Sequence, residues 1–510
     1  MSVTSNKVII NTGYLYFRLV VTMFMSLWST RLILKALGVS DFGLYNTIGW
    51  AIGMLSFINA SMAGVTQRYM SYYQGAGDHE KCHEIYNVSL VIHLVLALLF
   101  VGSLIVVGYF FFNGILNIPP DRIDAAKIIY AALTISTAFT VMSVPYEAII
   151  TAHEDMRFYG IEGVLRSFLK LLAAVAILYV DSDKLVFYGI LMAVISVIDM
   201  VVLRYYCQYA YDECVFSLSR YWNKSTAAAM AKFASWNFFI TSSNFVCNYG
   251  SVLTLNHFFG VVMNASAGIA SQFGGAIQTF SSSMRKALDP AITKSEGAGN
   301  REKMLRFSSS GCKFTFASFA ILAIPMYIEM PLVLHLWLGE YPEWAVLFSR
   351  LILIWTLIYI ATSPYDQSLM SEGEISGYSL MTSILNILTL ALLVILFING
   401  FPPVTMYILD IVVLGVLQSI VRVVYTHHKC GLSYKSFIIE VLIPILISLI
   451  VAFGISIIPS IIMAEGYIRL FITMMVSTVS YSLLFWACAT DMSEKAAIRS
   501  VVSSIRRRLT

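Results

Sequence analysis

An arginine stands inside the first long apolar stretch of the sequence. Arg18 lies within an apolar run that continues to Leu37. An arginine at the centre of a bilayer costs about 2.5–3.5 kcal/mol on insertion scales, so it usually faces a water-filled interior. A guanidinium in such an interior would bind an anionic group by charge-assisted hydrogen bonds. The alternative is that Arg18 reaches back to the lipid headgroups.

Two more cations share this stretch, and a third lies on a later one. Arg31 and Lys35 are spaced i,i+4 and would bind an anionic ligand or anchor the helix at the interface. Arg285 lies near the end of its apolar stretch, where the bias of basic residues toward one side of the membrane would also explain it.

Amide side chains form a second polar pattern. They repeat at spacings of four, three and four, which places them on one face of a helix, at Asn237, Thr241, Asn244 and Asn248. Such a stripe forms hydrogen bonds between helices or lines a hydrated cavity. Asn59 adds an amide on another apolar stretch. We take Asn59, Asn237, Asn244 and Asn248, with the four cations, as candidate substrate-binding residues.

Two acids are candidates for ion coupling. Glu147 and Asp366 each follow a Pro-Tyr pair. They would titrate during transport, or they would anchor loops at the ends of their helices. The sequence contains no P-loop, no Ser-His-Asp or HExxH pattern and no cysteine pair with metal-ligand spacing. We therefore predict no catalytic residues, no metal site and no cofactor, and we predict that the protein is not an enzyme.

These residues need membrane helices to position them. The chain has 510 residues, of which 58% are hydrophobic and 12% charged, about half the charged fraction of soluble domains. A spanning helix needs about 20 apolar residues. Fourteen segments qualify, so we predict an all-α integral membrane protein with spans at 10–36, 44–67, 88–112, 126–150, 161–180, 185–206, 236–259, 266–288, 311–331, 345–370, 378–399, 407–426, 437–458 and 467–489.

The chain contains an internal repeat. Residues 38–81 align with 260–303 without a gap, and Gly75-Ala76-Gly77 meets a second Gly-Ala-Gly at an offset of 222. The Pro-Tyr-acid motifs repeat at an offset of 219. Each half has six spans, so we predict two lobes related by a pseudo-two-fold axis along the membrane normal, a pattern typical of transporters. The Asp or Asn after each Gly-Ala-Gly is predicted to cap the next helix.

We therefore divide the chain as follows: 1–206 N-terminal six-helix lobe, 207–235 cytoplasmic linker, 236–428 C-terminal six-helix lobe, 429–490 two extra spans and 491–510 a basic amphipathic tail that anchors to anionic lipid. Placing both termini in the cytoplasm leaves most basic residues on the inner side, as the positive-inside rule requires.

The run from Arg31 to Asn46, RLILKALGVSDFGLYN, resembles the first-loop signature of Wzx-type flippases, which transport O-antigen and capsule units. These belong to the multidrug/oligosaccharidyl-lipid/polysaccharide exporter superfamily, and the resemblance extends over the whole chain in span number and arrangement. It implies two lobes with alternating access in the bacterial inner membrane. It also implies a polyprenyl-pyrophosphate-linked oligosaccharide as substrate, with Arg18 and Arg31, and more loosely Arg285, in the basic cavity.

The main expectation is therefore flipping of lipid-linked oligosaccharides, with Arg18 on the pyrophosphate and a proton or sodium gradient as a conceivable energy source. Partners would be that lipid, membrane lipids and other glycan-assembly proteins, and not nucleic acid. A cation-coupled drug exporter of the same superfamily is the nearest alternative. It would need buried acids in the first lobe, and the first two spans contain none. A glycan polymerase, an acyltransferase and a scaffold are more distant alternatives.

Overall fold

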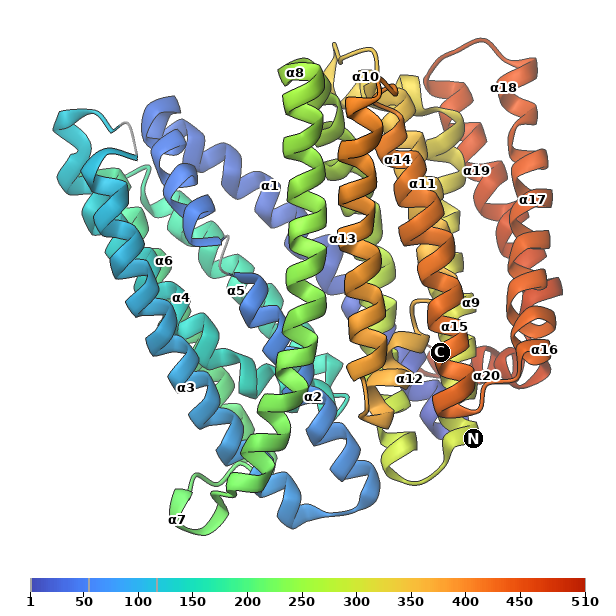
Figure 1. Cartoon of the computed structure of the whole chain (residues 1–510), viewed down its shortest axis with the longest axis horizontal. Coiled ribbons are helices and arrows are strands. Elements are labelled where there is room, and N and C mark those ends of the chain that lie inside the picture. Colours follow the sequence, from blue (N-terminus) through green and yellow to red (C-terminus); the bar gives the residue numbers. More distant parts are fainter. Residues whose placement is uncertain (1, 54–55, 116–117, 510) are drawn as a thin grey trace. The chain divides into compact units, whose positions relative to one another are not determined.

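A computed structural model describes residues 2–53, 56–115 and 118–509 (Figure 1). Within these ranges the chain is built of helices and contains no strand, which confirms the all-α class. Ten of the described helices are long and apolar enough to cross a membrane, or eleven if the bent pair α11–α12 forms one span. The predicted number was fourteen. Part of the difference arises because the 74-residue α8 counts once, although it contains two of the predicted spans.

The contacts divide the chain into two compact units. Unit 2 comprises residues 13–238 and unit 1 comprises residues 1–12 and 239–510. The lobe boundaries and the two-fold axis expected from the repeat stay predictions. Unit 2 holds most of α1 (Ser2–Gly53), with α2 (Ser56–Ala76), α3 (His79–Phe110), the π-helical η1 (Phe111–Ile115), the 3-10 turn η2 (Pro120–Arg122), α4 (Ile123–Ala152), α5 (Met156–Ala176), α6 (Lys184–Ala210) and α7 (Leu218–Tyr221).

Unit 1 holds most of α8 (Lys224–Gly297) and the rest of the described chain. Its other helices are α9 (Arg301–Ile328), α10 (Met330–Leu338), α11 (Ala345–Ile360), α12 (Tyr365–Glu372), α13 (Ser376–Ile398), α14 (Thr405–Leu409), α15 (Gln418–Cys430), α16 (Tyr434–Ser436), α17 (Ile443–Ser456), α18 (Ile458–Ile462), α19 (Tyr467–Leu484) and α20 (Met492–Leu509). The π-helical segments η3 (Asp410–Leu417), η4 (Phe437–Leu442) and η5 (Phe485–Ala489) continue α14, α16 and α19.

The two longest helices break at glycines that the repeat aligns. Gly38 in α1 has φ 72° and ψ 174°, and Gly260 in α8 has φ 79° and ψ −175°. This backbone region is essentially restricted to glycine, because a Cβ would clash with the adjoining peptide groups. The doubled sequence thus encodes the same break at the same place in each half.

The two Gly-Ala-Gly turns also share their geometry. Gly77 and Gly299 have φ values of 73° and 71°, which end α2 and α8 in the left-handed region. The Asp78 side chain then accepts a hydrogen bond from the Lys81 amide at 3.0 Å, and that of Asn300 accepts one from the Lys303 amide at 2.9 Å. The predicted N-caps of α3 and α9 are therefore confirmed.

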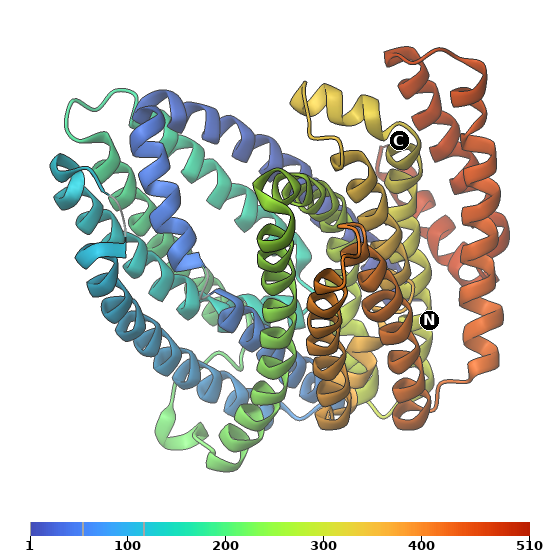
Figure 2. The same cartoon turned by 45° about the horizontal axis from the view of Figure 1, so that its top comes forward.

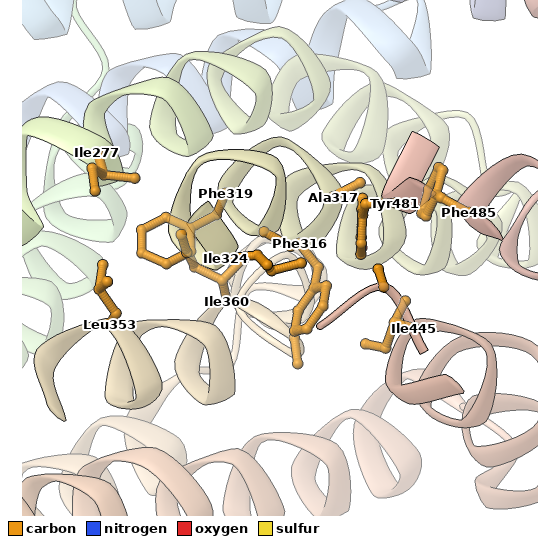
Figure 3. Packing of buried hydrophobic residues seen from close by; sticks show 14 of the residues in the cluster. Ile277, Phe316, Ala317, Phe319, Ile324, Leu353, Ile360, Ile445, Tyr481 and Phe485 are labelled. Carbon is orange, nitrogen blue, oxygen red and sulfur yellow. The ribbon is translucent and has the colours of Figure 1, made fainter. Parts of the chain in front are cut away.

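A hydrophobic cluster of unit 1 packs around α9 (Figure 3). Phe316 and Phe319 of α9 meet Leu353 of α11, Ile445 of α17 and Tyr481 of α19 in this cluster. Helices α17 and α19, which belong to the last two candidate spans of the described chain, lie side by side in both views and contribute to this cluster (Figure 2).

A buried ion pair ties α19 to the end of α9. Glu329, which is 0% exposed, accepts hydrogen bonds from Arg469 at 2.7 Å and from Thr473 at 3.0 Å. A buried carboxylate is tolerated only when charged and neutral donors satisfy it in this way.

The segment between α6 and α8 docks on unit 2 through polar contacts. Asn87 of α3 donates to the Val215 carbonyl at 2.9 Å and accepts from the Ser217 amide at 2.8 Å. His153, directly after α4, bonds Glu213 at 2.5 Å. Burial opposes ionisation of Glu213, but the bond and charge of His153 outweigh it and lower its pKa to about 2.

Candidate functional site

Three helices of unit 2 bring four charged side chains together. Arg166 of α5 lies 3.3 Å from Glu147 of α4, 3.1 Å from Asp199 of α6 and 3.3 Å from Glu162, one turn earlier on α5. Glu162 and Arg166 meet because residues spaced i,i+4 share a helix face. We call Glu147, Glu162, Asp199 and Arg166 the carboxylate cluster.

The cluster contains more negative than positive charge. One guanidinium faces three carboxylates, and the Glu162 side chain is only 2% exposed. Neither Glu162 oxygen has a hydrogen-bond partner among the described residues, although the Arg166 charge is near. Lys170, one turn further along α5, adds a positive charge that interacts with Asp199 and Glu162. Burying an incompletely compensated carboxylate is costly, so the cluster favours the uptake of a cation.

Arg18 of α1 contacts α5 on either side of Glu162 in the sequence, at Tyr159 and Gly163. Its guanidinium carbon is 3.9 Å from the centroid of the Tyr159 ring, a cation–π contact. It also lies against Gly163, where any added Cβ would collide with the guanidinium. Arg18 therefore points toward α5 within unit 2, against the residue that follows Glu162 in the sequence. Its role in binding substrate stays a prediction.

A polar cavity of about 190 Å³ lies in unit 1, between α8, α11, α12, α13 and α15. Arg422 of α15, with a side chain 1% exposed, lies 2.6 Å from Asp366 of α12. The Tyr378 hydroxyl donates to the same carboxylate. Arg285 and Asp289, one turn apart on α8, line the cavity as well. We call this the polar cavity; it brings together the predicted residues Asn244, Arg285 and Asp366.

The repeat relates the carboxylate cluster to the polar cavity. The offset of 219 that relates Glu147 to Asp366 also relates Tyr159 to Tyr378 and Asp199 to Gln418. Gln418 lines the polar cavity, so an acid of unit 2 corresponds to an amide of unit 1. Both halves thus keep a polar centre, but the surplus of acids belongs to unit 2.

The other predicted site residues do not join either centre. Arg31 and Lys35 are exposed on α1, and Asn248 is exposed on α8. Asn237 is half-buried on α8. Asn59 lies on α2, but its side chain is outside the described part of the structure.

Sequence reasoning missed most of the charged partners. It named Glu147, Asp366 and Arg285 but not the residues that face them, which are Glu162, Arg166, Asp199, Asp289 and Arg422. The i,i+4 pair of an acid and an arginine inside the fifth predicted span was the available signal. The argument against a cation-coupled exporter considered only the first two spans, which contain no acid. The structure places the acids of the carboxylate cluster on α4, α5 and α6. Among the described residues no group of three or more His, Cys, Asp or Glu side chains is placed to hold a metal ion.

No protein-family model matches the chain. The uncharacterized membrane protein EpsK of Bacillus subtilis (strain 168) is 30% identical over 102 residues, which cover 19% of this chain and 19% of that protein. The aligned segment thus spans about a fifth of this relative's length.

Several solved structures resemble nearly the whole fold. A MATE in the straight conformation has a TM-score of 0.72 at 14% identity, covering 84% of this chain and 96% of that chain. A MOP superfamily transporter from Pyrococcus furiosus has a TM-score of 0.68 at 14% identity, covering 84% and 96%. An outward-facing multidrug resistance MATE family transporter has a TM-score of 0.66 at 15% identity, covering 82% and 95%. These neighbours are transporters rather than enzymes, and at such identities the likeness concerns the fold. The chain thus has the fold of the MATE transporters of the MOP superfamily.

Proposed function

We propose that the protein is a cation-coupled exporter of small molecules, and that the carboxylate cluster is its coupling site. The surplus of carboxylates over guanidinium groups around Arg166 carries this proposal. The shared fold with a multidrug resistance MATE family transporter supports it.

The coupling follows from the cost of charge in the membrane. Glu162 is buried on α5, and an incompletely compensated charge in the interior of a protein is expensive. A proton or sodium ion that binds the cluster removes negative charge. It therefore stabilises whichever conformation buries the cluster more deeply, and a ligand shifts an equilibrium only through such differential binding.

The test uses purified protein in liposomes loaded with ethidium. Imposed proton and sodium gradients are applied in separate experiments, and dye movement is followed by fluorescence. We expect movement to depend on one of the two gradients. Glu162→Gln should lower that dependence at least about tenfold, the loss of roughly 1.4 kcal/mol of coupling. Asp124→Asn is the matched control, because Asp124 belongs to the same unit but its side chain is 95% exposed.

Two results would contradict this proposal. One is a rate of ethidium movement by the wild type that is independent of both the proton and the sodium gradient. The other is a Glu162→Gln protein that stays coupled as strongly as Asp124→Asn.

Transport of a lipid-linked oligosaccharide is the second candidate, and two exposed cations favour it. Arg31 and Lys35 lie one turn apart on α1, and neither has an acidic partner among the described residues. Guanidinium and ammonium groups at this spacing would bind a pyrophosphate. For the Pyrococcus furiosus transporter, a binding pocket of reverse polarity is described as suggesting a different function.

The same liposomes separate the two candidates. A fluorescent polyprenyl-pyrophosphate oligosaccharide is incorporated in the membrane, and its appearance in the opposite leaflet is measured. If this lipid is the cargo, Arg31→Ala with Lys35→Ala should slow its transfer at least about tenfold, while Lys127→Ala, a control cation of unit 2, should leave the rate unchanged. Ethidium movement without lipid transfer would exclude this second candidate.

A further inference from the structure

A second, larger cavity in unit 1 shares no lining residue with the polar cavity. Its volume is about 460 Å³, within the range of ligand-binding pockets. Its walls come from four separate helices and are mainly apolar, with Val8 and Ile9 of α1, Met284 and Leu288 of α8, Phe307 and Phe314 of α9, and Ala496 and Ile498 of α20. We call it the tail cavity, because α20 forms one side of it.

One face of α9 gives the tail cavity a polar and an apolar end. Lys303, Arg306, Ser310 and Phe314 line it in this order, at spacings that place them on one face. The face extends about 16 Å at 1.5 Å per residue. Both cations stand at the start of α9, and Phe314 stands at the far end. A molecule that matches this wall has an anionic head and an apolar tail.

The charges at the polar end leave a cation available. Lys303 Nζ lies 5.7 Å from the Phe307 ring centroid, and the ion pairs in this part of the described chain belong to Arg301, Arg306 and Lys313 and not to Lys303. Arg306 is partly neutralised, because its guanidinium lies 3.8 Å from Asp491 and also bonds Ser493.

The acid in the wall of the tail cavity is already paired. Glu494 of α20 lies 2.7 Å from Lys313 of α9, and both side chains are buried, at 8% and 6% exposure. Glu494 also accepts from Ser310 at 2.6 Å. These bonds hold α20 against α9 and remove the negative charge that would repel an anion.

We propose that the tail cavity binds an anionic phospholipid, with one acyl chain along Phe307 and Phe314 and the phosphate at Lys303 and Arg306. A membrane lipid is the occupant because α1, α8 and α9, which form three of the walls, are all candidate membrane spans. Basic residues near a membrane surface attract anionic lipid by about 1 kcal/mol each. The pairing of Glu494 with Lys313 then makes α20 a lid that lies against the bound lipid.

The test measures lipid binding to the purified full-length protein. Detergent-solubilised protein is titrated with phosphatidylglycerol or with phosphatidylcholine of the same acyl chains, and bound lipids are counted by native mass spectrometry. We expect a preference for phosphatidylglycerol that Lys303→Ala lowers about fivefold, the equivalent of roughly 1 kcal/mol. Lys435→Ala is the control, since Lys435 is an exposed cation of unit 1 that does not line the cavity.

A second variant tests the acyl site without changing charge. Ala496→Phe adds an aromatic ring to the cavity wall and should lower the affinity for both lipids. The proposal is wrong if the wild type binds both lipids equally. It is also wrong if Lys303→Ala and Ala496→Phe both bind phosphatidylglycerol with the same affinity as Lys435→Ala. Bound lipid would then not occupy the tail cavity.

Discussion

Arg422 Nε lies 2.6 Å from Asp366 Oδ1, and the arginine side chain is almost fully enclosed. The same guanidinium donates to Thr362 Oγ1 at 2.7 Å. This ion pair joins α15 to α12 at the edge of the polar cavity, so the acid that the repeat singles out neutralises a buried cation.

Removing the acid should therefore destabilise unit 1. Asp366→Asn leaves the Arg422 charge uncompensated, a change that costs about 3–5 kcal/mol for a buried pair. Glu374→Gln is the control, because Glu374 and Lys429 are 68% and 34% exposed and such solvent-exposed pairs contribute little to stability. Thermal unfolding of the purified variants compares them. Equal unfolding temperatures would contradict the structural role of this pair.

Gly163 of α5 has no side chain, and the guanidinium of Arg18 from α1 occupies the space beside it. Gly163→Ala should force the guanidinium off the Tyr159 ring and cost about 1–3 kcal/mol, as overpacking does. Gly160→Ala is the matched control, since the nearest atom to its added Cβ would be the Tyr14 carbonyl oxygen, at an ordinary contact distance of 3.5 Å. Unfolding temperatures and ethidium transport are measured for both. Equal unfolding temperatures and equal transport rates for the two variants would show that the contact between Arg18 and α5 contributes to neither.

The break in α8 should depend on glycine at one position. Gly260→Ala is expected to cost about 1–3 kcal/mol, because alanine is strained at the observed φ although the space around it is open. Gly268 lies on the same helix in open space without a positive φ, so Gly268→Ala should be neutral or stabilising by up to about 1 kcal/mol. The difference in unfolding temperature checks this, and a harmless Gly260→Ala would refute it.

The contact between His153 and Glu213 should make stability depend on pH. The pKa of Glu213 is lowered in the folded protein to about 2 from 4.5, so the fold favours its ionised form. The resulting stabilisation is present above pH 4.5 and is lost as the pH falls toward 2. Because Glu213 is partly solvated, we expect a loss on the order of 1 kcal/mol.

This effect is measured by unfolding temperatures between about pH 6 and about pH 3. Glu213 becomes protonated in the unfolded chain within this range and stays mostly ionised in the folded protein. Glu213→Gln should flatten the acid part of the profile relative to the wild type. Asp212→Asn, a change at an exposed neighbour, should leave the profile unchanged. Parallel profiles for the wild type and Glu213→Gln would contradict the assignment.

Local features of this fold were predictable because they depend on residues close in sequence. Asp78 and Asn300 cap the helices that follow them, since a cap needs only a short polar side chain next to the first amides. Gly38 and Gly260, aligned by the repeat, break their helices in the same way. The functional interpretation was less successful, because it rested on the absence of acids from the first two spans and left out the acids on the fourth to sixth spans.

The amino-acid sequence by itself determined the all-α class, the paired glycine breaks and the helix caps, because hydrophobic length, a repeated glycine and hydrogen bonding near a helix end are features of short segments. Only the tertiary structure decided that Arg166 meets Glu147 and Asp199, and that Arg18 lies against Gly163. Such meetings depend on the rotation and axial position of each helix against its neighbours. Those are set by the packing of many side chains at once, which no single segment records.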